Sequence, residues 1–214
     1  HTEISIHDLP PGSVDDLSKA VREYTRGSGN PRQQVAQRKQ VITANVTDAE
    51  IKKISAAPDH VYDIDDARFL GRVNPALKVS DYSYLKLKPL DLEITRSCTL
   101  KITQANGLLR KGMNTGYSRY YQCPEGDVYT KDMLLEGVRK ITIKEQQNVS
   151  FNGYAGMMHG YRDASGHGYT HLAWVSNNTS HVVERVGVTS DTRTWLVAYA
   201  TELTRLELNG VAPK

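Results

Sequence analysis

The stretch that decides the fold is residues 168–208, with the sequence GYTHLAWVSNNTSHVVERVGVTSDTRTWLVAYATELTRLEL. It begins with two strand-like runs, 168–175 and 181–188, which turn-forming residues near 176–180 separate. Its last part, 190–208, has apolar residues at helical spacing and predicts an amphipathic helix. The apolar stripe consists of Trp195, Leu196, Tyr199, Leu203 and Leu206. Consecutive strands followed by such a helix indicate a sheet with the helix packed across one face.

Further strands are expected upstream of this stretch. The clearest is 92–102, whose residues alternate between apolar and polar, although Arg96 interrupts the apolar face. Strand-like runs follow at 138–145 and 149–162, and a short helix is expected at 131–136. These elements predict an α+β fold: an antiparallel sheet with a long C-terminal helix packed on one face and short N-terminal helices.

The Asn106-Gly107 pair is the strongest hairpin signal in the chain. It predicts a turn at that point, with a second strand returning through 108–113 and another through 117–123.

The N-terminal region predicts a strand at 1–7 and a helix from Ser13 to about Thr25. The run Gly27-Ser28-Gly29-Asn30-Pro31 ends that helix and forms a linker. We therefore expect residues 1–30 to pack as a strand and helix on a main α+β domain of residues 31–214, within one compact domain.

Composition excludes several classes of protein. The chain has 214 residues, and 27 Lys+Arg against 24 Asp+Glu give a net charge of only +3. Because the charges are interspersed, no nucleic-acid partner is indicated. No run of apolar residues is long enough for a transmembrane segment.

The two cysteines, Cys98 and Cys123, each lie near the end of a predicted strand, so a disulfide between them is geometrically reasonable. A bridge predicts a secreted or periplasmic protein, and a lipid-anchored or cell-surface location fits equally. His1 is either a mature secreted terminus or what remains of an expression tag. Sequons occur at Asn45, Asn148, Asn177 and Asn178 and mean glycosylation only in a eukaryotic secretory protein.

Histidines supply the candidate metal ligands. His159, His167 and His171 flank a predicted hairpin turn. If Asp163 pairs with His167, His159 lies opposite His171 on one face, whereas pairing of Asp163 with Gly168 splits them. His1 could chelate copper through its amine and imidazole, as in copper-dependent polysaccharide monooxygenases, which the chain resembles in that one residue.

Neither nucleophilic nor phosphate chemistry has a motif here. The chain has no G-x-S-x-G elbow, and Ser165 and His167, which only Gly166 separates, do not by themselves define a triad. The segment from Gly153 to Gly156 is not a P-loop, because no lysine follows it. We therefore assign no catalytic residue and no cofactor.

Tyrosine is abundant, with 12 residues against 2 Phe, which favours half-exposed contact surfaces over deep cores. Tyrosine and arginine cluster in the segment 108–121, and both are enriched at binding hot spots. The side chains predicted to form a contact surface for another protein are Arg110, Tyr117, Arg119 and Tyr120.

Residues 138–208 have the rhythm of a strand, NGYAG at 152–156, a strand, YTHLAW at 169–174, a strand and a helix. This layout resembles the final sheet and helix of PsbP/Mog1-like α+β modules, as found in bacterial periplasmic binding and immunity-type proteins. The resemblance implies a non-enzymatic protein-binding module, an inhibitor or immunity factor. The alternative is a secreted enzyme, a hydrolase or copper-dependent oxidase, that uses the His-rich hairpin or His1. The oligomeric state stays open.

Overall fold

The computed structural model describes residues 1–5, 57–67, 73–136 and 140–210, in two compact units. The described part of the first unit is a pair of parallel strands, β1 (Thr2–Ile4) and β6 (Ile141–Ile143), followed by the short 3-10 helix η6 (Lys144–Gln146). The predicted helix from Ser13 and the linker at 27–31 lie outside the described residues.

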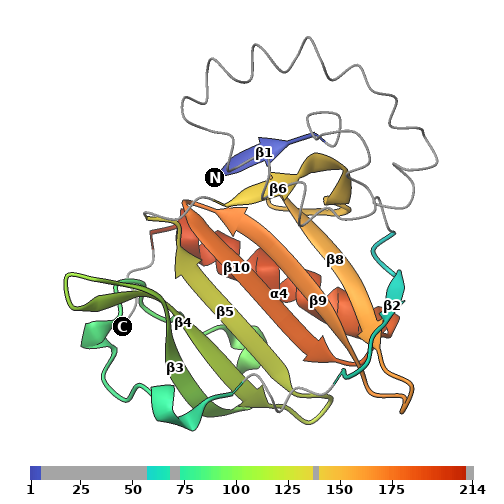
Figure 1. Ribbon diagram of the computed structural model, residues 1–214, viewed down its shortest axis with the longest axis horizontal. Coiled ribbons are helices and arrows are strands. Elements are labelled where there is room, and N and C mark those ends of the chain that lie inside the picture. The colour runs from blue at the N-terminus through green and yellow to red at the C-terminus, as the bar shows by residue number, and fades with distance from the viewer. Residues whose placement is uncertain (6–56, 68–72, 137–139, 211–214) are drawn as a thin grey trace. The chain divides into compact units, whose positions relative to one another are not determined.

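The second unit contains an eight-stranded sheet with the strand order β2-β8-β9-β10-β5-β4-β3 (Figure 1). β7 pairs with β8 at the same edge as β2, and all strand pairs except β2 with β8 are antiparallel. The strands are β2 (Val61–Asp63), β3 (Thr99–Arg110), β4 (Met113–Gln122), β5 (Val128–Leu134), β7 (Val149–Phe151), β8 (Tyr154–Arg162), β9 (Gly168–Ser176) and β10 (Thr179–Val186).

The C-terminal helix α4 (Ser190–Leu208) lies across one face of this sheet (Figure 1). Its N-cap is Thr189, whose side chain accepts a hydrogen bond from the Thr192 backbone N–H. The prediction of a helix at 190–208 is confirmed. Leu196 and Leu203 are buried in the core against Met158, Leu172 and Val183, whereas Trp195 and Leu206 are partly buried at its margin.

The predicted α+β class is wrong, because the described residues form a mainly β fold with a C-terminal helix. In the segment 131–136, predicted as a short helix, residues 131–134 belong instead to β5, an interior strand between β4 and β10. The residues of β5 that face α4 include the buried polar Thr130 and Asp132, so polar side chains on the buried face hid the strand alternation. The predicted short N-terminal helices lie outside the described residues.

Segment 92–102 also differs from its prediction. The short 3-10 helix η5 (Glu93–Thr95) precedes β3, and Leu92 and Ile94 pack on the core beneath α4. The first two backbone N–H groups of η5, those of Glu93 and Ile94, donate to the carboxylate of Glu202 on α4. Residues 92–98 therefore tie α4 to the sheet without forming a strand, whereas residues 99–102 form the start of β3, as predicted.

The hairpin turn predicted at Asn106-Gly107 is wrong as well. β3 continues through this pair to Arg110, and the turn to β4 lies at Lys111-Gly112, where both residues have positive φ, at 50° and 79°. Pairing with β4 shifts register between Asn106 and Leu109, so Gly107 lies in a bulge. Gly107 has φ +78°, and a Cβ there would meet Thr115 Oγ1 at 2.4 Å, which explains the glycine.

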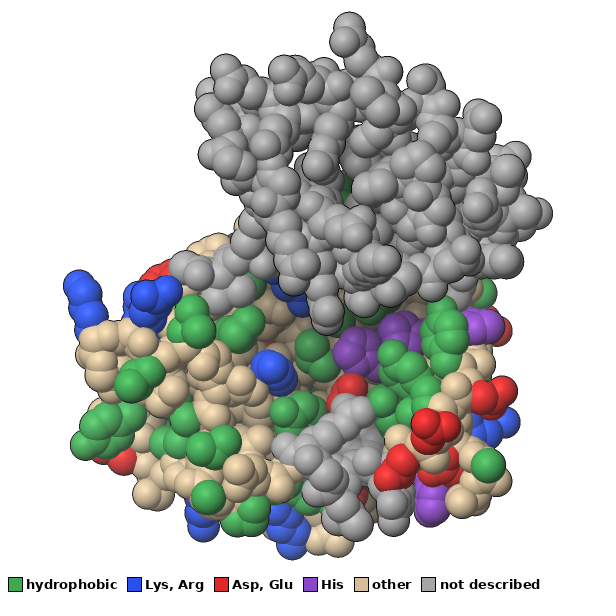
Figure 2. Space-filling model, viewed as in Figure 1, with side chains coloured by type: hydrophobic (Ala, Val, Ile, Leu, Met, Phe, Trp, Pro, Cys, Tyr) green, Lys and Arg blue, Asp and Glu red, His purple; other side chains and the backbone are tan. Residues whose placement is uncertain are grey.

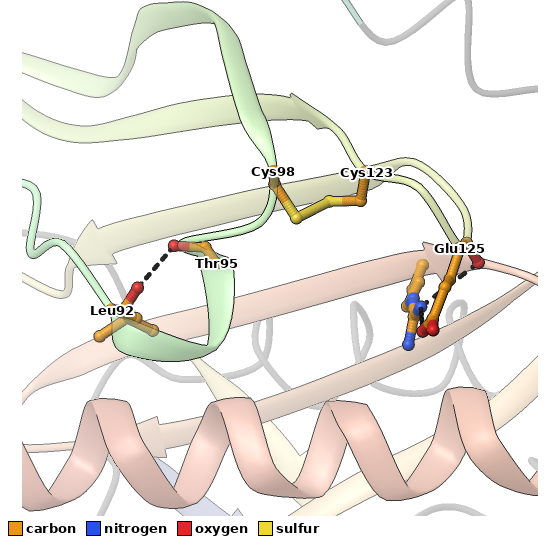
Figure 3. Close-up of a disulfide and its surroundings, with 6 residues drawn as sticks. Leu92, Thr95, Cys98, Cys123 and Glu125 are labelled. Atoms are coloured by element: carbon orange, nitrogen blue, oxygen red, sulfur yellow. Dashed lines mark hydrogen bonds and ion pairs between the residues drawn. A yellow bond between two sulfur atoms is a disulfide. The ribbon is translucent and has the colours of Figure 1, made fainter.

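The predicted disulfide between Cys98 and Cys123 is confirmed, with an S–S distance of 2.06 Å (Figure 3). Cys98 directly precedes β3 and Cys123 directly follows β4, so the bridge joins neighbouring strand ends.

Loss of this bridge is expected to lower the free energy of unfolding by roughly 3 kcal/mol, because it releases a loop with a sequence separation of 25 residues. Urea unfolding of the Cys98→Ser/Cys123→Ser double variant measures this loss. Wild-type protein in reductant should show the same loss of unfolding free energy. A double variant as stable as the wild type would contradict the expectation.

Candidate binding surface on the sheet face opposite the helix

The turn between β8 and β9 sets the register of the histidines. Asp163 N donates to the His167 carbonyl at 2.9 Å, and His159 therefore lies directly opposite His171. The Asp163 carboxylate holds the turn by accepting from the backbone N–H groups of Ser165, His167 and Ala67 at 2.9–3.1 Å. Of the two registers considered from the sequence, the structure has the one that puts both histidines on one face.

This face is the one that α4 does not cover. Met158 and Leu172 point to the core beneath α4, so their neighbours His159 and His171 point to the other side of the sheet. Figure 2 views this side and shows histidine and hydrophobic side chains gathered over β8 and β9. We call the following group of side chains the ring cluster: His60, Tyr62, His159, Tyr161, Tyr169 and His171.

The rings of this cluster order one another. His159 stacks on His171 with ring centroids 5.2 Å apart, and its Nε2 hydrogen-bonds the Tyr161 hydroxyl at 2.7 Å. Tyr62 from the edge strand β2 packs edge-on against His159 at 5.3 Å, and Tyr161 contacts Tyr169 at 5.0 Å. His171 Nδ1 lies 2.8 Å from the buried Glu184 carboxylate on β10. Four strands thus fix the positions of these side chains.

Burial, and next the nearby His60, lower the pKa of His159 from its ordinary 6.5 to about 4. His159 is therefore neutral at pH 7, and a single hydrogen bond joins its ring to the Tyr161 hydroxyl.

Acid is expected to destabilise the native protein through this group. Between pH 6.5 and 4 the unfolded chain protonates His159 while the folded chain does not, so stability falls as the pH falls through this window. The loss from this one group reaches about 2–3 kcal/mol at pH 4. The urea midpoints of wild type and His159→Gln are measured across this pH range. The midpoint should depend less on pH in the variant, because it lacks the titrating ring. Parallel curves would contradict it.

The histidines do not assemble a metal site within the described residues. No group of three His, Cys, Asp or Glu side chains there is placed to hold a metal ion. His159 and His171 stack face to face, and each already uses one ring nitrogen, on Tyr161 and Glu184 respectively. His1 hydrogen-bonds Thr142 within the first unit at 2.8 Å.

The four side chains predicted to form a contact surface are not brought together. Arg110 is exposed beside the β3–β4 turn, and Tyr120 lies half-buried with its hydroxyl bonded to Asp127. Tyr117 and Arg119 point to the opposite face, toward α4, and both are 4% exposed. Tyr120 points to the face opposite Tyr117 and Arg119, because successive side chains along β4 alternate between the two faces of the sheet.

Arg119 is a structural cation. Its Nη1 donates to the Leu90 carbonyl, the Asp91 carboxylate and the Tyr121 hydroxyl at 3.0–3.1 Å, and its guanidinium lies 5.8 Å from the centre of the Tyr117 ring. Substitution of Arg119 therefore disturbs the core, contrary to the expectation that it serves a contact surface.

A polar network that the sequence did not suggest lies under the end of α4. His181 Nδ1 is 2.6 Å from Asp132 Oδ1, and its Nε2 is 2.8 Å from Ser176 Oγ. Trp174 stacks on the imidazole with centroids 4.8 Å apart. No clear signal in the sequence indicated this network, because the same strand faces carry other buried polar residues, such as Thr130 and Arg185.

Ser176, His181 and Asp132 have the hydrogen-bond order of a catalytic triad, yet they are not placed for catalysis. Ser176 and His181 are each 1% exposed, and the Ser176 hydroxyl donates to Glu207 of α4 at 2.6 Å. Because the Ser176 hydroxyl directs its proton to Glu207, it is not poised to give that proton to His181. The network holds the end of α4 on the sheet.

Comparison of the sequence with protein families and with curated proteins, and of the structure with solved structures, found no match. The resemblance of residues 138–208 to PsbP/Mog1-like modules stays a prediction. Among the described residues no helix has the length and apolar character needed to cross a membrane.

Proposed function

We propose that the protein is a secreted or periplasmic, non-enzymatic module that binds another protein, an inhibitor or immunity factor, with the ring cluster as its contact surface. The observation that supports this most is the interlocked set of rings on the sheet face opposite α4. Tyr62 is 36% exposed at the outer edge of the cluster and His60 is exposed, so a partner can reach both.

Ordered rings suit a binding surface for two reasons. Tyrosine provides a large apolar area with a polar tip, and it is enriched among the residues that dominate binding energies. Ring contacts with His159 and Tyr161 already restrict Tyr62, so a partner that packs against it causes little further loss of side-chain entropy.

The disulfide supports the proposed compartment, since such bonds persist in oxidising environments. If the chain passes through a eukaryotic secretory pathway, Asn177 and Asn178 at the exposed β9–β10 turn can accept a glycan. Asn148 cannot do so without loss of structure, because its amide bonds both the backbone N–H and the carbonyl of Met158 at 2.8 Å.

Co-purification from the native host tests the proposal. Wild type, Tyr62→Ala and the matched control Tyr84→Ala are compared by quantitative mass spectrometry. Tyr84 is 61% exposed and lies on η4 (Tyr82–Tyr84), outside the ring cluster. If Tyr62 is a hot spot, its variant should lose about 2 kcal/mol or more of binding energy, roughly a thirtyfold loss in affinity. Equal recovery of the partner by all three proteins would overturn the proposal.

A further inference from the structure

A pocket of about 190 Å³ lies beside the disulfide, on the sheet side that carries α4. Its walls are the Cys98–Cys123 bridge, Ser97, Pro124, Glu125, Arg185 of β10 and Trp195 of α4. A single water needs only about 15 Å³ of such space, so the pocket can hold a carboxylate with several further atoms. It is separate from the ring cluster, whose side chains point to the other face.

Arg185 is the charged group of this pocket. The residue is 5% exposed, and its guanidinium lies 4.8 Å from the centre of the Trp195 ring. Its Nη2 donates to the carbonyl and the carboxylate of Glu125 at 3.3 and 3.1 Å (Figure 3), whereas its buried Nε has no hydrogen-bond partner. Arginine has five N–H donors in a planar fork, so most of this binding capacity is unused.

The partner that Arg185 does have is weakly held. The Glu125 side chain is 84% exposed, on the turn between β4 and β5, and an ion pair with so exposed a carboxylate contributes little. A buried cation with an exposed, replaceable counter-charge is the arrangement expected of a receptor for an outside carboxylate, because the ligand can take the place of Glu125 without any change in the core.

We propose that this pocket binds a carboxylate through Arg185, that the Glu125 carboxylate occupies the place of the ligand when it is absent, and that the Trp195 ring and the disulfide form its apolar wall. The shared chemistry is a carboxylate at the end of a short apolar stem. A peptide C-terminus and a small free carboxylic acid are the two sources.

The test uses nuclear magnetic resonance of the full chain, with the Arg185 Nε–H and Trp195 indole signals followed at constant ionic strength. The probes are the tripeptide alanyl-alanyl-glycine with an acetylated N-terminus, the same tripeptide with an amidated C-terminus, and acetate. The free-acid tripeptide should shift both signals in a saturable manner, while the buried Trp174 indole, the only other one, stays unchanged. The amidated tripeptide should shift neither.

Glu125→Ala provides the decisive variant, since it removes the competing carboxylate at an exposed position and leaves Arg185 intact. Affinity for the free-acid tripeptide should rise severalfold. Acetate binding as tightly as the tripeptide would assign the pocket to small free carboxylates, and tighter tripeptide binding would assign it to a chain terminus; both results support the proposal. Equal shifts with the amidated tripeptide, or no saturable shift in Glu125→Ala up to about 100 mM probe, would overturn it.

Discussion

A chain that ends at Thr189 is expected to remain unfolded. Without α4 the sheet face that carries Met158, Leu172 and Val183 is open to water, and these side chains are at most 1% exposed in the native protein. Leu196, Ala200 and Leu203 of α4 supply the opposite side of that core, and a sheet with one uncovered apolar face is not independently stable.

The matched control ends at Gly210, which retains the whole of α4 with its C-cap Asn209. Circular dichroism and urea unfolding compare the two chains. The shorter chain should show no cooperative transition, whereas the control should match the full-length protein. A cooperative transition in the chain that ends at Thr189 would show that the core does not depend on α4.

Replacement of His181 by Ala is expected to cost about 3–5 kcal/mol of folding free energy, because it leaves the buried Asp132 carboxylate without its ring partner. Asp132 is 3% exposed and cannot recover hydration in place of the lost contact. Glu207→Gln keeps an acceptor for the Ser176 hydroxyl and should cost only about 1 kcal/mol.

His167→Ala is the control for this prediction. His167 also pairs with an aspartate, Asp163, at 3.0 Å, but its side chain is 55% exposed, so its removal should cost less than about 1 kcal/mol. Urea unfolding of the three variants measures the order of the losses. A His181→Ala protein as stable as His167→Ala would show that the buried network adds nothing to the attachment of α4.

The predictions that succeeded are those that depend on local pattern. The apolar stripe of 190–208 shows the 3.6-residue period, and Thr189 precedes it as a cap, so the helix could be located from sequence. The wrong predictions concern positions where a neighbouring strand decides. Asn106-Gly107 suits a turn or a bulge equally, and only the pairing of β3 with β4 selects the bulge.

The candidate site was only partly visible in the sequence. His159 and His171 were identified as a pair that one register would bring together, and the Asp163 turn provides that register. Tyr62 was not associated with them, because β2 comes from about a hundred residues earlier and pairs with β8 only in the folded chain.

The sequence by itself determined the long C-terminal helix and the cysteine pair, since both follow from residues that act within a few turns or at strand ends. Only the tertiary structure decided which polar side chains are buried. Arg119, Asp132 and His181 look like surface residues in isolation, and they lie in the core because distant segments of the chain supply hydrogen-bond partners that offset the cost of removing them from water. Such partners are separated by tens of residues, as Asp132 is from His181, and no local pattern encodes them.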